Sequence, residues 1–311
     1  MRGGHLQTLL GHFIPSPEVQ SGERVEVTLP DQDKMVGFYH PGDVDVLVYL
    51  FHGLGGHAGR DYMARAAIMA QRRGYHVIRM NHRGCGAGRG LAKGPYHSGR
   101  AEDLAEVVRY GRQRFPDLKH VVIGFSLSGN ALLLLNAGYR GSTQPDFGIA
   151  VNAPIRLDYA AIDIEQGFNR VYCQRFVRLC RQAVTERVED GLIDGPQQMP
   201  KVMTLRRFDD LFTAPAGGFR DKQDYYDSCS AAYHISNIKV PTVMLTCEDD
   251  PFVKFKPYQE LDLPEMVHLH VERHGGHMGY LTRRTTPVSD RRWLDYALDQ
   301  WLGAWHGECT I

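Results

Sequence analysis

One serine-containing segment has the residue types and spacing of a nucleophile elbow. In VVIGFSLSGNALLLL a β-branched run changes directly into an apolar helical pattern, which predicts a strand, a sharp turn and a helix. The turn needs small residues near its serine, and Gly124 satisfies this need before Ser126. Ser128 stands where the usual pattern has a second glycine, but centring the turn on Ser128 would crowd it more. We therefore expect Ser126 to be a nucleophile, against the alternative of an ordinary β-to-α turn with exposed serines.

A serine hydroxyl is a weak nucleophile at neutral pH, so it requires a neighbouring base and an acid that orients this base. The segment LTCEDDPFVK ends an apolar strand with acidic residues, of which Asp250 is preferred as the acid and Asp249 is the second choice. By themselves, both aspartates are better explained as turn residues. The segment VERHGGHMGY contains His274 and His277, and we prefer His277 as the base because nearby glycines on both sides give its backbone room to turn the ring inward.

A second glycine-rich turn, HGLGGHAG, follows the buried strand pattern LVYLF. Backbone N–H groups in such a turn and after the nucleophile stabilise a developing oxyanion, which assigns Leu54 and Leu127 to an oxyanion hole. The spacing fits neither GxGxxG nor a lysine-bearing phosphate loop, so nucleotide binding is not favoured. The alternative of a metal cluster finds no matching cysteine or carboxylate spacing among the histidines His268, His270, His274 and His277. We expect neither a metal nor another cofactor.

The elements that must position these residues alternate along the chain. ERVEVTLP and KMVGFYH predict a leading antiparallel hairpin, after which short apolar runs alternate with helical segments at residues 61–73 and 100–114. This rhythm predicts an α/β fold with a mainly parallel, twisted sheet flanked by helices. The rhythm stops over residues 156–235, where we expect a helical cap inserted into a core of residues 1–155 and 236–311. An amphipathic helix is expected near residues 290–301.

Composition limits the partners and the class of protein. The 36 Lys and Arg residues balance 36 Asp and Glu residues, so the overall charge favours neither nucleic acid nor an anionic membrane as a partner. No apolar run is long enough for a membrane span, and we read no signal peptide at the N-terminus, so we expect a cytoplasmic protein without stable membrane insertion. Scattered cysteines without a CxxC pair agree with reduced thiols in this compartment: Cys85, Cys173, Cys180, Cys229, Cys247 and Cys309. The oligomeric state stays open.

Several motifs in joint order resemble one family. HLQTLLGHF, HGLGG, NHRGCG, YHSGRAEDL, GFSLSGN, EDDPFV and HGGHMGY, together with FDDLFTAPAGGF and DYYDSCSA, resemble the YheT-like branch of the α/β-hydrolases, which is related to the ABHD1 and ABHD3 group. The resemblance spans nearly the whole chain and implies the α/β-hydrolase fold and ester-hydrolase chemistry. It implies a nucleophile at Ser126, an acid at Asp250 and a base at His277. Residues that we expect to brace the rim of the pocket, or to contact substrate, are Asn81, Arg83, His97 and Ser98.

The resulting hypothesis is a serine hydrolase that cleaves carboxylic esters of short or medium acyl chains through an acyl-enzyme. Aromatic residues of the expected cap either line an acyl pocket or pack the cap onto the core: Phe168, Tyr172, Phe176, Tyr225 and Tyr226. One alternative is acyl transfer to an alcohol with the same triad. Another is a noncatalytic ligand-binding protein on a hydrolase scaffold.

Overall fold

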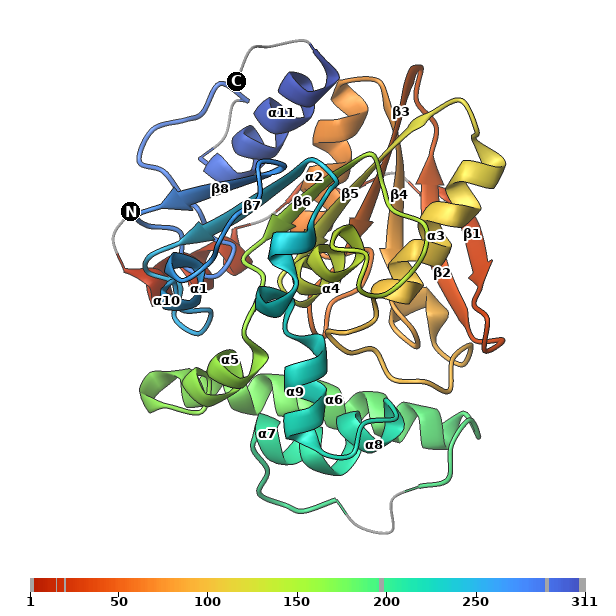
Figure 1. Cartoon of the computed structure of the whole chain (residues 1–311), viewed down its shortest axis with the longest axis vertical. Helices are drawn as coiled ribbons and strands as arrows, with labels where there is room; N and C mark the ends of the chain where they lie inside the picture. The colour runs from red at the N-terminus through yellow and green to blue at the C-terminus, as the bar shows by residue number, and fades with distance from the viewer. Residues whose placement is uncertain (1–2, 15, 20, 196–198, 289–290, 308–311) are drawn as a thin grey trace.

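The computed structural model describes residues 3–14, 16–19, 21–195, 199–288 and 291–307, which contain one eight-stranded sheet (Figure 1). The strand order is β1-β2-β4-β3-β5-β6-β7-β8; β1 and β2 form the expected antiparallel hairpin, β2 also pairs antiparallel with β4, and the other neighbours are parallel. The strands are β1 Glu23–Thr28, β2 Lys34–His40, β3 Val44–Phe51, β4 Tyr75–Asn81, β5 Lys119–Phe125, β6 Phe147–Val151, β7 Thr242–Cys247 and β8 Val267–Glu272.

Helices cover both faces of the sheet, which explains why its central strands are apolar on both sides. Along β3, Leu47, Tyr49 and Phe51 pack in one core with helices α3 (Ala101–Arg114) and α4 (Leu127–Asn136). The alternate residues of β3 face a second core, which contains α2 (Asp61–Arg72) and α11 (Trp293–His306). The alternation expected from the sequence therefore produces a three-layer arrangement. The last helix begins and ends a few residues later than we expected.

The chain between β6 and β7, residues 152–241, is called the insertion below. Its described elements are helical, and Figure 1 shows most of them as a layer beneath the sheet. They are α5 Leu157–Asp163, η2 Gly167–Asn169, α6 Arg170–Glu189, α7 Leu205–Phe208, η3 Asp209–Thr213, α8 Ala214–Ala216, α9 Lys222–Cys229, η4 Ala231–Tyr233 and η5 Ile235–Asn237. Three further short elements lie outside it: α1 Gly4–Phe13, η1 Gly86–Gly88 and α10 Lys256–Gln259. In the part of the chain that the structure describes, no helix combines the length and apolarity needed to cross a bilayer.

Candidate active site

Ser126 occupies a sharp turn between β5 and α4. Its φ of 54° and ψ of −116° are rare for a side chain other than glycine, as expected for a strained elbow. The Ser126 N–H donates to the carbonyl of Val151 on β6 over 2.7 Å, and this bond ties the turn to the neighbouring strand. A Cβ at Gly124 would lie 2.5 Å from the carbonyl oxygen of Ser128, so this position requires glycine for the strand and helix to meet.

The structure brings His277 and Asp250 to this serine. His277 Nε2 lies 3.0 Å from Ser126 Oγ, and His277 Nδ1 lies 2.8 Å from Asp250 Oδ2. Asp250 follows β7 and is buried, and the N–H groups of Phe252 and Val253 donate to its Oδ1. With its proton on Nδ1, the imidazole is oriented by the carboxylate and can accept the serine proton at Nε2.

Asp249, the alternative acid, has a different position. Its Oδ1 accepts hydrogen bonds of 2.8 and 2.9 Å from the N–H groups of Gly275 and Gly276, and its Oδ2 contacts His274 Nδ1 at 3.2 Å. Burial tends to raise the pKa of Asp249, but the hydrogen bonds from these two N–H groups hold it below its ordinary value. Asp249 therefore shapes the loop that carries His277, whereas the hydrogen bond to the His277 ring comes from Asp250.

Two supports of the acid and the base were not expected from the sequence. Asn152, directly after β6, donates from Nδ2 to Asp250 Oδ2 over 2.9 Å and has a φ of 47°. Helix α1 packs against the histidine loop, where Thr8 Oγ1 accepts the His277 N–H over 2.8 Å. The motif HLQTLLGHF contains Thr8 and is one of the motifs that resemble the family, so the sequence did mark this segment. Its pattern alone does not show which residues the helix contacts.

Ser128, which replaces the usual second glycine, is fully buried and hydrogen-bonded. Its Oγ lies 2.7 Å from His82 Nε2 and 3.1 Å from the Tyr96 hydroxyl, and it donates to the carbonyl of His52. Burial lowers the pKa of His52 to about 4 and that of His82 well below its ordinary value, so both rings are neutral at pH 7. Ser128 therefore connects the elbow to the loops that follow β3 and β4.

The loop after β3 approaches the elbow closely. A Cβ at Gly53 would lie 3.0 Å from the Cβ of Ser126, so only a glycine allows this approach without displacement. Leu54 and Leu127 line the same cavity as Ser126, and their N–H groups have no hydrogen-bond acceptor among the residues described. Leu127 is also the first residue of α4, whose N-terminal end favours negative charge. Both N–H groups are therefore candidates for the oxyanion hole that the sequence predicts.

Two cavities meet at Ser126. The larger, of about 440 Å³, lies between the core and the insertion; the smaller, of about 280 Å³, also contacts His277. Phe176, Tyr225 and Tyr226 line the larger cavity, as the acyl-pocket hypothesis expects, and Phe176 also lines the smaller one. Phe252, which the sequence did not single out, lines both cavities.

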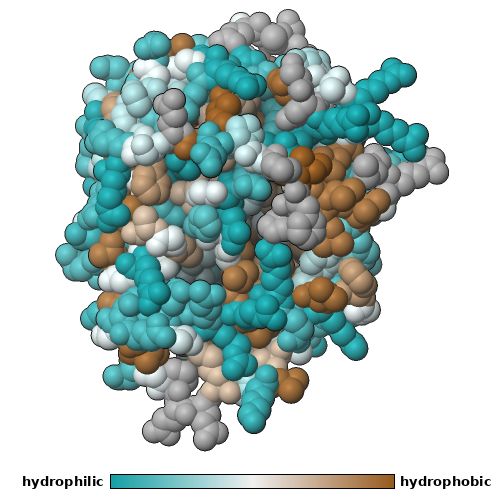
Figure 2. Space-filling view, turned by 180° about the vertical axis from the view of Figure 1, so that it is seen from behind, coloured by the Kyte–Doolittle hydropathy of each residue, from teal (hydrophilic) through white to brown (hydrophobic). Residues whose placement is uncertain are grey.

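The other two aromatic residues differ from this pattern. Tyr172 lines only the smaller cavity, and its hydroxyl bonds His5 Nδ1. Phe168 lines neither cavity: its side chain is exposed and its ring packs against His5. The expectation of Phe168 in the pocket is therefore wrong, because its ring projects outward beside α1. Figure 2 shows apolar residues gathered at the right of its view, the side on which α1 lies.

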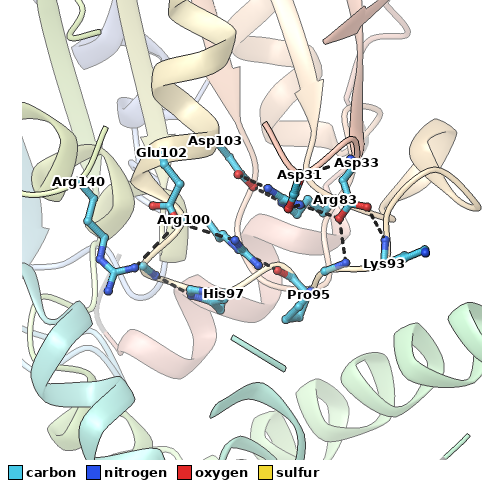
Figure 3. Close-up of polar contacts among 12 residues, drawn as sticks. Asp31, Asp33, Arg83, Lys93, Pro95, His97, Arg100, Glu102, Asp103 and Arg140 are labelled. Carbon is cyan, nitrogen blue, oxygen red and sulfur yellow. Dashed lines mark hydrogen bonds and ion pairs between the residues drawn. The ribbon is translucent and has the colours of Figure 1, made fainter. Parts of the chain in front are cut away.

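The residues expected to brace the rim lie in buried networks. Arg83 donates to both oxygens of Asp103 and to Asp31 and Asp33, over 2.6 to 2.7 Å (Figure 3). Asp33 also accepts the N–H groups of Lys93 and Gly94, so the ion pairs hold the loop that lines one end of the larger cavity.

The three other residues named for the rim are held in place in similar ways. Asn81 Oδ1 accepts the Ala58 N–H, and the Ser98 N–H donates to the Tyr225 hydroxyl. His97 lines the larger cavity and packs edge-on against Tyr225. Bracing accounts for Asn81 and Ser98, whereas Arg83 and His97 combine bracing with a place on the cavity wall.

The structure also bears on the metal-site alternative and on the state of the cysteines. Within the described ranges, no three His, Cys, Asp or Glu side chains converge as a metal site requires, and His270 contacts Glu272 instead. Five cysteines have free thiols, whereas Cys309 lies outside the described residues. The five are Cys85, Cys173, Cys180, Cys229 and Cys247.

Comparisons with known proteins bear on the family and the fold. The model of the alpha/beta hydrolase family matches residues 48–291. The chain is 29% identical to the putative esterase YheT of Escherichia coli (strain K12), over 96% of this chain and 89% of that protein. It is 26% identical to the phospholipase ABHD3 of Mus musculus, over 88% of this chain and 70% of that protein. The solved esterase Pf2001 of Pyrococcus furiosus superposes with a TM-score of 0.61 at 18% identity, over 94% of this chain and 100% of that one. The α/β-hydrolase fold expected from the sequence is confirmed.

Proposed function

Because the chain belongs to the alpha/beta hydrolase family, we propose that it is a serine hydrolase that cleaves carboxylic esters through an acyl-enzyme. The observation that carries the proposal is the unbroken series of hydrogen bonds from Ser126 Oγ to His277, 3.0 Å, and from His277 to Asp250, 2.8 Å. This series ends at a serine that lines an apolar cavity, where an ester can lie against it.

In the proposed reaction Ser126 Oγ attacks the ester carbonyl while His277 Nε2 takes the serine proton. Asp250 stabilises the resulting imidazolium, and the N–H groups of Leu54 and Leu127 stabilise the oxyanion. His277 then protonates the leaving alcohol. Water attacks the acyl-enzyme with His277 again as the base, and the acid product leaves as the serine recovers its proton.

The larger cavity supports an acyl chain of short or medium length as the preferred substrate. Its wall is mostly apolar and comes from both the loops that follow the strands and the insertion, with Phe176, Leu179 and Phe212 among its residues. We therefore treat residues 156–235 as a cap over a core of residues 1–155 and 236–311. An apolar chain gains about 0.8 kcal/mol for each CH₂ group that it buries, so activity should rise with chain length until the cavity is full.

The test combines active-site labelling with a series of p-nitrophenyl esters of increasing acyl length. A fluorophosphonate probe should label the wild type but not Ser126→Ala. Ser126→Ala and His277→Ala should each lower kcat by a factor on the order of 10⁶. Asp249→Asn is the matched control, because it should retain labelling if Asp250 is the acid. Undiminished labelling of Ser126→Ala, or turnover by Asp250→Asn as fast as that of Asp249→Asn, contradicts these assignments.

A further inference from the structure

Asp209 is a buried carboxyl group in the wall of the larger cavity that the proposed triad does not use. It is 8% exposed and begins the π-helix η3, between α7 and α8. Turns of π-helix are rare and are frequently found at functional sites. This position therefore combines an ionisable side chain, a cavity and an unusual backbone.

The carboxylate of Asp209 has neutral partners. The Tyr226 hydroxyl donates to its Oδ2 over 2.8 Å, and the nearby Thr213 side chain tends to lower its pKa. Within the described residues, no Lys, Arg or His nitrogen comes within 4.0 Å of it. In contrast, its neighbour Asp210 has a cationic partner, Lys222.

Buried arginines on the cavity wall do not compensate Asp209, since Arg83 is already paired with aspartates of the core. Arg187 donates from its guanidinium to the carbonyl oxygens of Ala183, Arg83 and Gly94, which ties α6 to the loop after β4. None of these three hydrogen bonds involves Asp209. Arg187 therefore has a structural role at another part of the wall.

Asp209 is ionised at neutral pH despite its burial. Burial raises its pKa to about 6 against the opposing effects of Thr213 and Tyr226, while the nearby charges of Glu165 and Asp210 raise it further. A buried carboxylate without a cation is costly, and a ligand that brings a positive charge removes this cost.

Aromatic rings line the cavity together with this carboxylate. Phe208 and Phe212 have ring centroids 5.1 Å apart, and Tyr225 and Tyr226 have centroids 5.3 Å apart. Aromatic faces attract cations, most strongly where water is excluded. A methylated ammonium group suits such a wall better than a primary amine, because its methyl groups need no hydrogen bonds.

We propose that Asp209 and these four rings bind an alkylated ammonium group of the ester substrate. The inference rests on the proposed function and narrows it to esters that carry a trimethylammonium-like cation on the acyl or the alcohol part. The cation occupies the apolar cavity with Asp209 as its counter-ion, while the ester carbonyl lies against Ser126.

The test compares pairs of esters that differ by one charge. In the first pair a p-nitrophenyl ester has an acyl chain that ends in a trimethylammonium group or in the isosteric, neutral tert-butyl group. In the second pair the same two groups end the alcohol. The measured quantity is the ratio of kcat/KM for the cationic and the neutral member, so that general effects of a substitution cancel.

We expect the wild type to prefer the cationic member of at least one pair by about tenfold or more. Asp209→Asn should lower the ratio several-fold, to the part that the rings contribute, whereas Asp210→Asn, which changes the adjacent residue, should keep it. Equal rates for both members in the wild type, or an undiminished preference in Asp209→Asn, overturn the proposal.

The neutral esters test the proposed ester hydrolysis separately from the cation site, because their hydrolysis does not depend on that site. If no ester is hydrolysed, binding of an alkyltrimethylammonium ion is measured by calorimetry on the wild type and on Asp209→Asn. Binding that is about tenfold weaker in Asp209→Asn supports the cation site, and equal binding overturns it.

Discussion

Replacing Asp209 with asparagine should stabilise the protein at neutral pH, because it removes a buried charge and keeps the shape of the side chain. The pKa of this carboxyl is about 6 in the folded protein, against an ordinary value of 3.8. The folded state therefore holds the proton more tightly than the unfolded chain, and wild-type stability falls as the pH rises through this window. A difference of about two pH units corresponds to a cost of about 3 kcal/mol, fully present above about pH 6.

Urea denaturation of the wild type and of Asp209→Asn between about pH 4 and pH 8 measures this cost. Groups that titrate alike in both proteins cancel in the difference between their free energies of unfolding. We expect the free energy of unfolding of the variant to gain about 2–3 kcal/mol relative to that of the wild type as the pH rises from about 4 to about 8, with most of the change below about pH 6.

Asp210→Asn is the control, because this neighbouring carboxyl has the opposite shift. The backbone N–H and the ammonium of Lys222 lower the pKa of Asp210, so its charge stabilises the folded state above its ordinary pKa and its loss should be slightly unfavourable at neutral pH. A difference between Asp209→Asn and the wild type that is constant with pH would refute the view that Asp209 is buried as a poorly compensated charge.

Three further substitutions test the supports of the elbow and the acid. Gly124→Ala places a Cβ 2.5 Å from the Ser128 carbonyl oxygen, so the free energy of unfolding in urea should fall by about 1–3 kcal/mol and fluorophosphonate labelling should be lost. A urea midpoint equal to that of the wild type would contradict the packing at the elbow. Ser128→Ala leaves the buried His82 Nε2 without its 2.7 Å partner, so the free energy of unfolding should fall by about 1–3 kcal/mol in the same assay. An unchanged midpoint would show that this hydrogen bond adds no stability. Asn152→Ala removes the donor to Asp250 and puts alanine at a φ of 47°, so kcat on a p-nitrophenyl ester should fall about 10- to 100-fold. A kcat equal to that of the wild type would show that Asn152 does not position the acid.

The sequence alone determined the layout of this protein, because its signals are local. Short apolar strands that alternate with helical segments require a parallel sheet with both faces covered, and both cores have this composition. The strand-turn-helix pattern around Ser126 and the glycine-rich loop of His277 place these side chains at the ends of parallel strands, which meet at one edge of the sheet. Their 3.0 Å contact agrees with that reasoning.

Only the tertiary structure decided which groups touch across distant loops. The adjacent Asp249 and Asp250 have the same chemistry, and the path of the chain after β7 brings Asp250 to His277 and Asp249 to the loop amides. The role of Ser128 depends on His82, which is far from it in sequence, and the outward position of Phe168 depends on α1. The period of a sequence pattern fixes which face a residue takes within its own element, whereas loop paths fix its neighbours from other elements.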